Sequence, residues 1–216
     1  MKLNLKIKKL VQITWGLLLL ILLSSSTFAQ KGSSPFKKIY LQGGFGGASR
    51  NGLSAELNIQ AVIKNKWVAS IAYQNIEATP KNLPGDYEGD VFIFFPIDLT
   101  PNTNLNLFSI TAGKYFSTGK RTWITTEGGI TFGNGEKMTF THTDPQFFII
   151  GKTSNYDYTT EKKNLAGVML RADFNWAFAS FMGLGANVYV NINSIQSPVG
   201  FNLKLLVGKM GIAKNK

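Results

Sequence analysis

The stretch Leu53-Ser54-Ala55-Glu56-Leu57-Asn58-Ile59-Gln60-Ala61 decides the fold, because apolar and polar residues alternate along it without a break. Successive side chains of a β-strand point to opposite faces, so the stretch predicts a strand with one apolar and one polar face. The same period of two recurs along the chain and predicts eight strands, at residues 38–48, 53–62, 67–76, 105–116, 122–132, 168–176, 184–193 and 201–208. Strands of about ten residues suit a tilted bilayer crossing, which predicts an all-β, eight-stranded, antiparallel, up-and-down transmembrane β-barrel.

The first 29 residues have the three parts of a secretory signal peptide. An apolar run at residues 13–23 follows a basic start made of Lys2, Lys6, Lys8 and Lys9. Small residues come next, and we expect cleavage after Ala29. The alternative is an uncut membrane anchor, which needs an apolar run of about 20 residues. The mature chain then divides into a short periplasmic segment at 30–37, the barrel at 38–209 and a polar tail at 210–216.

Composition narrows the class of protein further. The chain has 23 basic and 12 acidic residues, a balance that by itself favours nucleic acid as a partner. The leader holds four of the lysines, and an exported chain does not meet nucleic acid, so we expect none. The chain has no cysteine, which excludes a disulfide framework, a thiolate metal site and a lipid anchor. Only 16% of the residues are charged, which favours a surface in contact with lipid.

The lengths of the connections indicate an orientation. Short connections are predicted at 63–66, 117–121 and 177–180, and long ones at 77–104 and 133–164. Two further connections, around Arg50 and Ser197, are also short. Outer-membrane barrels of Gram-negative bacteria have short periplasmic turns and longer external loops. An even number of strands with both termini in the periplasm reproduces this order, which predicts an outer-membrane location.

Aromatic and basic residues gather at the strand ends assigned to the periplasm. The aromatic residues predict a girdle at the membrane interface, although Trp123 has inward parity and ordinary core packing is the alternative. They are Tyr40, Trp67, Phe116, Trp123, Trp176, Phe178 and Phe181. The basic residues predict a rim that meets anionic headgroups. They are Lys37, Lys38, Lys64, Lys66, Lys120, Arg121, Lys209, Lys214 and Lys216.

Charged residues on the polar parity predict an ion-pair cluster inside the barrel, which is Glu56, Glu127, Arg171, Asp173 and Lys204. Buried charges are costly unless they are paired, so we expect Glu127 and Arg171, on neighbouring strands, to form a pair. Side chains fill a barrel of eight strands, which predicts a plugged interior and no open pore. The alternative function of the cluster is a gated path for protons or ions.

The leader, the eight alternating segments, the order of short and long connections and the charged interior resemble the small OmpA- and OmpX-type outer-membrane barrels. The glycine-rich first strand at residues 41–48 is similar to that of small barrels from Bacteroidota-type genomes. One feature departs from the pattern, since such barrels usually end on an aromatic residue. Here the last aromatic residue is Phe201, and the chain continues to Lys216.

Catalytic motifs are scarce, so we expect no enzyme, no cofactor and no metal. The lone histidine, His142, lies in Thr141-His142-Thr143-Asp144 within the second long connection. Some barrels of this size resemble lipid A acyl-modifying enzymes that pair a histidine with a serine and an acid, but no serine lies at a matching strand position here. Gly43-Gly44-Phe45-Gly46-Gly47 is not followed by a helix, so it is no phosphate-binding loop.

The two long connections are where a specific function is expected. The first holds four acids (Asp86, Glu88, Asp90 and Asp98) and an apolar run at 91–95. The second holds an apolar run at 147–150 together with Tyr156 and Tyr158. Such runs in exposed loops indicate either contact with a ligand or partner, or hairpins that prolong strands three to six above the membrane.

Three functions therefore remain open. The first is an outer-membrane barrel with a structural or surface-interaction role through its long loops, in contact with membrane lipid. The second is a lipid-modifying enzyme with His142 as its base. The third is a soluble, lipocalin-like carrier in which the polar parity faces water and the apolar residues surround a ligand.

Overall fold

A computed structural model describes residues 36–89, 91–92, 100–145, 147–148 and 151–210. The predicted leader, residues 30–35 and residues 211–216 lie outside these ranges. No helix in the described part of the chain is both long and apolar enough to cross a bilayer.

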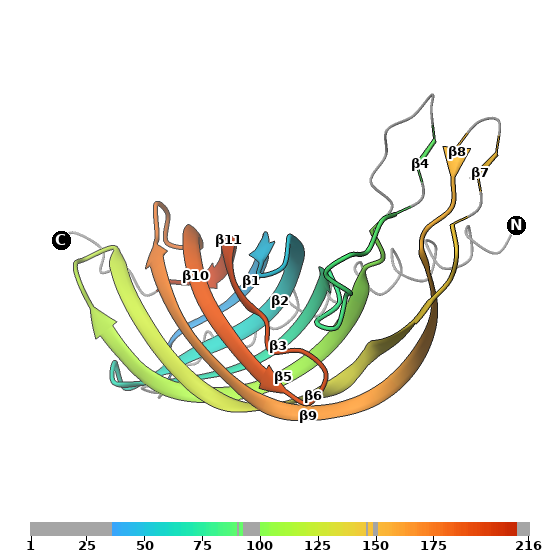
Figure 1. The fold of residues 1–216 in the computed structure, drawn as a ribbon. Helices are drawn as coiled ribbons and strands as arrows, with labels where there is room; N and C mark the ends of the chain where they lie inside the picture. The colour runs from blue at the N-terminus through green and yellow to red at the C-terminus, as the bar shows by residue number, and fades with distance from the viewer. Residues whose placement is uncertain (1–35, 90, 93–99, 146, 149–150, 211–216) are drawn as a thin grey trace, which may run out of the picture. The chain divides into compact units, whose positions relative to one another are not determined.

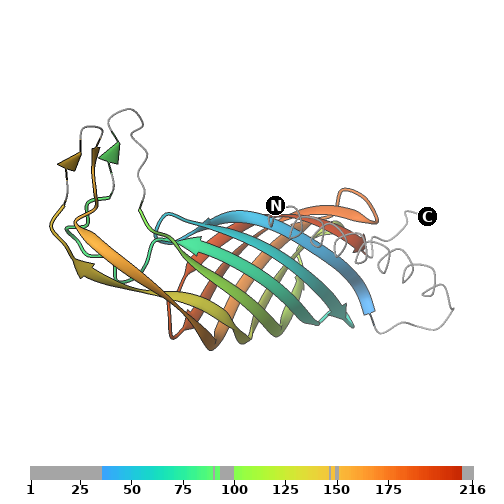
Figure 2. The same ribbon diagram turned by 90° about the vertical axis from the view of Figure 1, so that its right-hand side faces the viewer.

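Eight antiparallel strands close into a barrel, in which each strand pairs with its neighbour in the chain and the first pairs with the last (Figures 1 and 2). This confirms the predicted all-β, up-and-down architecture. The barrel strands are β1 (Phe36–Ala48), β2 (Gly52–Ile63), β3 (Trp67–Ala78), β5 (Thr103–Ser117), β6 (Thr122–His142), β9 (Tyr156–Trp176), β10 (Met182–Asn193) and β11 (Val199–Lys209).

The burial of β2 shows which face of the sheet is inside. Ser54, Asn58 and Gln60 are buried, whereas Leu53 and Ile59 are exposed. The same arrangement holds around the barrel, where one outward row of aliphatic side chains crosses all eight strands through the paired residues Ile192, Val168, Ile130, Ile110, Ile71, Ile59, Leu41 and Val207. A carrier in water needs the opposite arrangement, so the lipocalin-like alternative is wrong.

Tight turns join the strands at two adjoining hairpins. Arg50 and Asn51 have φ values of 63° and 53°, and Lys64 and Asn65 have φ values of 49° and 55°. Two successive residues with positive φ form a type I′ turn, whose twist matches that of the flanking strands. The connections 64–66, 118–121 and 177–181 lie at one end of the barrel, called the short-turn end below. The opposite end, called the loop end, carries the longer connections.

The predicted second loop at 133–164 is wrong in extent, because most of it is strand. β6 and β9 each have 21 residues and stay paired as far as His142 and Tyr156. The hairpin alternative is therefore confirmed for these two strands, while β3 and β5 have 12 and 15 residues. The alternation of apolar and polar residues stops where the outward side chains are no longer apolar, although the backbone pairing of β6 with β9 continues. That is why the sequence pattern ended early.

A small second sheet joins the two long connections. β4 (Val91–Phe92), from the first connection, pairs with β8 (Gly151–Lys152), which pairs with β7 (Phe147–Phe148). The predicted apolar runs at 91–95 and 147–150 thus contribute backbone to this sheet, and their remaining residues lie outside the described ranges.

The described residues include one position at each predicted boundary of the barrel. β1 begins at Phe36, inside the segment predicted as 30–37. Met210, predicted as the first residue of a polar tail, is buried among apolar side chains. The barrel therefore includes one residue beyond its last strand.

Candidate functional site

The interior of the barrel has three layers along its length. Apolar side chains fill the loop end, among them Ile76, Leu107 and Met169. Another apolar group, which includes Trp123 and Leu206, fills the short-turn end. Polar and charged side chains from β1, β2, β6, β9, β10 and β11 occupy the space between the two, and all of them are buried.

Arg171 on β9 lies at the centre of the charged layer. Its guanidinium nitrogens lie 3.1 Å from Glu127 Oε1, 2.9 Å from Glu56 Oε1 and 3.6 Å from Asp173 Oδ2. Glu127 and Arg171 are direct partners in the β6–β9 register. Glu56 comes from β2, which does not pair with β9, so this contact crosses the lumen.

Lys204 on β11 completes the ion-pair cluster. Its ammonium nitrogen lies 2.6 Å from Asp173 Oδ1 and 3.2 Å from Glu56 Oε1. It also donates a hydrogen bond to Gln42 Oε1 at 3.0 Å. The five residues that the sequence placed on the inward face thus lie in one contiguous cluster, with three carboxylates and two cations.

Neutral donors stabilise the excess negative charge. Ser70 and Thr111 donate to Glu127 Oε2 at 2.5 and 2.7 Å, and Gln60 donates to Glu127 Oε1. Asn187 and Asn202 donate to Glu56 Oε2 at 3.0 and 3.2 Å. These hydrogen bonds give the buried carboxylate oxygens of Glu127 and Glu56 donors in addition to the two cations. Sequence analysis did not single out these donors, although each has the inward parity of its strand.

Two residues of the predicted aromatic girdle point inward, so that prediction is wrong for Tyr40 and Trp123. They are 1% and 0% exposed, and their rings meet edge to face at 5.7 Å. Trp123 Nε1 donates to the Tyr40 hydroxyl at 3.0 Å, and that hydroxyl donates to Gln60. Parity decides their position, because both share the face of the buried polar residues beside them. They seal the short-turn end below the charged layer.

The other five girdle residues lie on the outside near the short-turn end. Their exposed fractions are between 39% and 58%, and they are Trp67, Phe116, Trp176, Phe178 and Phe181. Trp67 also stacks under Lys114, whose ammonium nitrogen lies 3.3 Å from the ring centroid. Sequence analysis missed Lys114, although its position opposite Trp67 follows from the pairing of β3 with β5.

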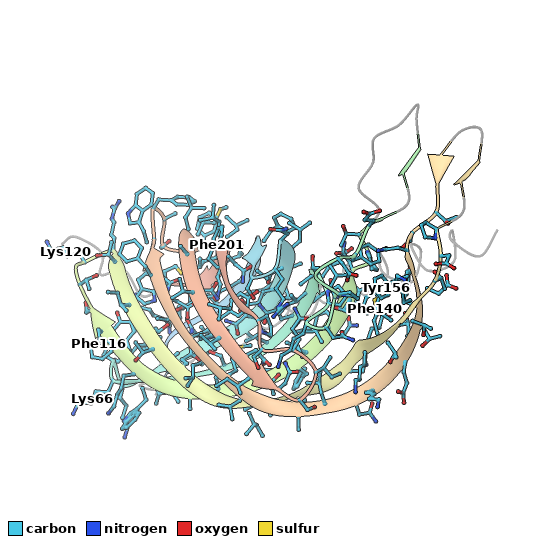
Figure 3. All side chains as sticks on the ribbon, viewed as in Figure 1. Lys66, Phe116, Lys120, Phe140, Tyr156 and Phe201 are labelled. Carbon is cyan, nitrogen blue, oxygen red and sulfur yellow. The ribbon has the colours of Figure 1, made fainter. Side chains whose placement is uncertain are left out.

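The predicted basic rim is exposed except at one residue. Lys66 and Lys120 lie with Phe116 at the short-turn end in Figure 3. Lys38 instead is buried, donates a hydrogen bond to the Met210 carbonyl and lies 4.0 Å from the Trp123 ring centroid. It has inward parity, so its inclusion in the rim was wrong. The exposed members within the described residues are Lys37, Lys64, Lys66, Lys120, Arg121 and Lys209, while Lys214 and Lys216 lie outside these residues.

At the loop end, side chains from the first long connection and from the ends of β6 and β9 form an aromatic cluster. Tyr87 lies 6.0 Å from Phe140 and 6.3 Å from Tyr156 between ring centroids. Phe140 lies 6.0 Å from Tyr158, and His142 lies 5.0 Å from Tyr156. We call these five residues the loop cluster; Figure 3 labels Phe140 and Tyr156.

Hydrogen bonds fix the first long connection to the β6–β9 hairpin. Asn155 donates through Nδ2 to the Asp86 carbonyl at 2.8 Å and accepts from the Glu88 amide at 2.8 Å. The Tyr156 hydroxyl donates to the Asp86 carboxylate at 3.0 Å, and this bond raises the pKa of Tyr156. Asp86 therefore serves as a structural acceptor here. Two of the four predicted loop acids, Asp90 and Asp98, lie outside the described residues.

The lone histidine of the chain, His142, also lies at the loop end. His142 is exposed and packs its ring against Tyr156. Within the described ranges, no three histidine or acidic side chains are grouped as a metal site would require.

No protein-family model matches the chain, and no curated protein matches its sequence. Among solved structures, the N-terminal β-barrel domain of Pseudomonas aeruginosa OprF matches with a TM-score of 0.50 and 10% identity, covering 80% of this chain and 97% of that one. The attachment invasion locus protein Ail of Yersinia pestis matches with a TM-score of 0.44 and 9% identity, covering 80% of this chain and 95% of that one. The match to OprF shows a shared β-barrel fold, which the predicted OmpA- and OmpX-type resemblance fits.

Proposed function

We propose that this chain is an integral outer-membrane protein with a structural and surface-interaction role. The observation that supports the proposal most directly is that apolar side chains cover the outside of the barrel and charged side chains lie inside it. Large apolar side chains such as Phe45, Val188 and Leu203 are 59–67% exposed around the outside, whereas the five charged side chains of the ion-pair cluster are buried inside. Water would penalise that outer surface, and hydrocarbon would not.

The predicted export route agrees with this location. A secretory leader, cleaved after Ala29, would deliver the chain to the periplasm of a Gram-negative cell. The exposed lysines and aromatic rings of the short-turn end suit the headgroups of the inner leaflet, which supports an orientation with the loop end outside the cell. The glycine-rich first strand supports a Bacteroidota-type barrel within this class.

The surface-interaction role is assigned to the loop cluster and the joined connections around it. Tyr158 is 49% exposed although its ring contacts Phe140. Aromatic rings held in place by neighbours offer contact area with little further loss of conformational entropy on binding. A carbohydrate or protein at the cell surface is the class of partner that such rings suit.

We propose no enzymatic activity and no cofactor. The His142 ring is packed against Tyr156, and the strand serines Ser54, Ser70 and Ser109 are buried inside the barrel. If His142→Ala alters the lipid A acylation profile of the host cell, the non-enzymatic proposal is wrong.

Membrane fractionation tests the location. The mature chain should remain in the outer-membrane pellet after a carbonate wash and migrate differently on gels before and after heating, as folded barrels do. Recovery of a compact monomer from the periplasm without detergent would contradict the proposal.

Shortened loops test the surface role separately. Cells that carry a variant with residues 80–101 and 137–161 each replaced by a short turn are compared with cells that carry the native chain. Binding to purified polysaccharides and matrix proteins should fall in the variant while its heat-dependent gel mobility is kept. Unchanged binding would remove the surface role and leave the location standing.

A further inference from the structure

Three successive outward rows cross β3, β5, β6 and β9 where these strands approach the loop end. The lowest is aromatic and contains the paired residues Tyr73, Phe108 and Phe132. The next consists of four paired asparagines, called the asparagine row here, which are Asn75, Asn106, Asn134 and Asn164. The third contains the pairs Glu77–Asn104 and Glu136–Lys162, which a hydrogen bond from the Asn104 amide to Glu136 joins. Figure 2 shows β6 and β9 extending beyond the other strands toward the small second sheet.

Hydrogen bonds hold the asparagine row in a fixed arrangement. Asn106 accepts through Oδ1 from the Tyr73 hydroxyl at 2.8 Å and from Asn75 Nδ2 at 3.1 Å. Asn106 Nδ2 in turn donates to Asn134 Oδ1 at 3.4 Å. The side chains lie on the outside of the barrel, and Asn134 and Asn164 are exposed. A line of amides, each with donor and acceptor groups, is therefore presented outward.

The asparagine row lies where the apolar surface ends. The row on the other side of the aromatic residues consists of Ile71, Ile110 and Ile130, which are 46–61% exposed. The flanking strands β2 and β10 behave differently, because they keep apolar outward residues as far as Leu53 and Ile192 near the loop end. The amides thus belong to one side of the barrel and not to its whole circumference.

The two ends of the apolar surface differ in chemistry. At the short-turn end the outward groups include the ammonium groups of Lys114, which lies over Trp67, and of Lys66 nearby. At the loop end the first polar outward groups are neutral amides, followed by a row that carries both charges, on Glu77, Glu136 and Lys162. Ammonium groups attract lipid phosphates, whereas neutral amides carry no charge that would attract them.

We propose that the asparagine row binds the uncharged sugar headgroup of a glycolipid in the outer leaflet. Amides match sugar hydroxyls because both donate and accept hydrogen bonds. The aromatic row gives apolar ring surface for the sugar carbons, with Tyr73 49% and Phe132 44% exposed. The ligand is lipid-borne because these rings continue the surface that faces hydrocarbon. The inference rests on the proposed membrane location.

The test measures lipid binding to the full mature chain in mild detergent by native mass spectrometry. The probes are a diacylglycerol with an uncharged dihexose headgroup and a phosphatidylglycerol with the same acyl chains. Two hydrogen bonds of about 1 kcal/mol each correspond to a preference of about tenfold or more for the glycolipid. The double variant Asn106→Leu/Asn134→Leu should lose this preference. Thr126→Leu, at an exposed outward position of β6 nearer the short-turn end, should keep it.

A second variant keeps the test decisive if the double variant does not fold. Asn164→Ala changes only the exposed end of the row and should weaken the preference in part, with heat-dependent gel mobility unchanged. Equal affinity of the native chain for both lipids, or a preference that survives the double variant, would overturn the inference while the membrane location stands. Equally tight binding of the free dihexose would overturn the lipid-borne source. Failure to retain any lipid would count against the membrane location itself.

Discussion

Arg171 is the single residue on which the charged interior depends most. It contacts all three carboxylates of the ion-pair cluster. Arg171→Met would leave these carboxylates with Lys204 alone, and breaking a buried pair from one side costs about 3–5 kcal/mol. We expect the free energy of unfolding in lipid vesicles, measured with urea and tryptophan fluorescence, to fall by that amount.

The matched control for Arg171 removes both partners of one pair. Arg171→Met/Glu127→Met removes one cation together with one carboxylate and leaves Glu56 and Asp173 beside Lys204. The double variant should therefore recover part of the stability that Arg171→Met loses. A loss of less than about 1 kcal/mol in the single variant would match an exposed pair and would contradict the burial described here.

The loss of stability caused by an outward arginine on β10 should depend on how deep in the bilayer the arginine lies. Val188 is 59% exposed and lies midway along β10, whereas Leu184 is 47% exposed and pairs with Trp176 near the short-turn end. Arginine on a lipid-facing surface costs about 2–4 kcal/mol at the bilayer midplane and about 0–1 kcal/mol near the interface. Val188→Arg should therefore destabilise the barrel more than Leu184→Arg in the same unfolding measurement.

Equal costs at the two positions would contradict the proposed placement in the bilayer. A polar control is Thr126→Ser, an outward position where a small polar side chain already stands. Its unfolding free energy should stay within about 0.5 kcal/mol of the native value.

At the level of elements, the β6–β9 hairpin and the first long connection form one structure through Asn155. Besides its two side-chain contacts, the Asn155 carbonyl accepts from the Thr143 amide at 3.0 Å. Asn155→Ala removes the side-chain contacts to Asp86 and Glu88 and should loosen the first connection, which the bond from Tyr156 to Asp86 still joins to the hairpin. We expect faster proteolysis within residues 79–89, measured by limited digestion of intact cells, with the barrel's unfolding free energy unchanged.

The control for Asn155 is Asn102→Ala, also in the first connection, where the amide donates to Glu77 at 3.3 Å. That contact does not reach the hairpin, so digestion should proceed at the native rate. If both variants are digested equally fast, the hydrogen bonds of Asn155 do not hold the connection in place.

For the whole molecule, the layered interior argues against conduction. Apolar layers lie at both ends of the charged layer, and the cluster within it is internally paired. We expect the purified protein to show no steady conductance in planar bilayers. A steady current abolished by Arg171→Ala would instead support the gated path for protons or ions.

The sequence by itself determined the strands and their two faces. A period of two is a local property of extended backbone, so the inward parity of Glu56, Glu127 and Lys204 could be read without knowing any partner. The same parity indicates that Tyr40 and Trp123 face inward, and it is a better guide to their orientation than their position near a strand end. The tertiary structure alone decided which strands meet across the lumen, as Glu56 and Arg171 do, and which loops join through Asn155 and Asp86. Those contacts depend on how the barrel closes and on the path of the loop backbone, and neither produces a periodic pattern in the sequence.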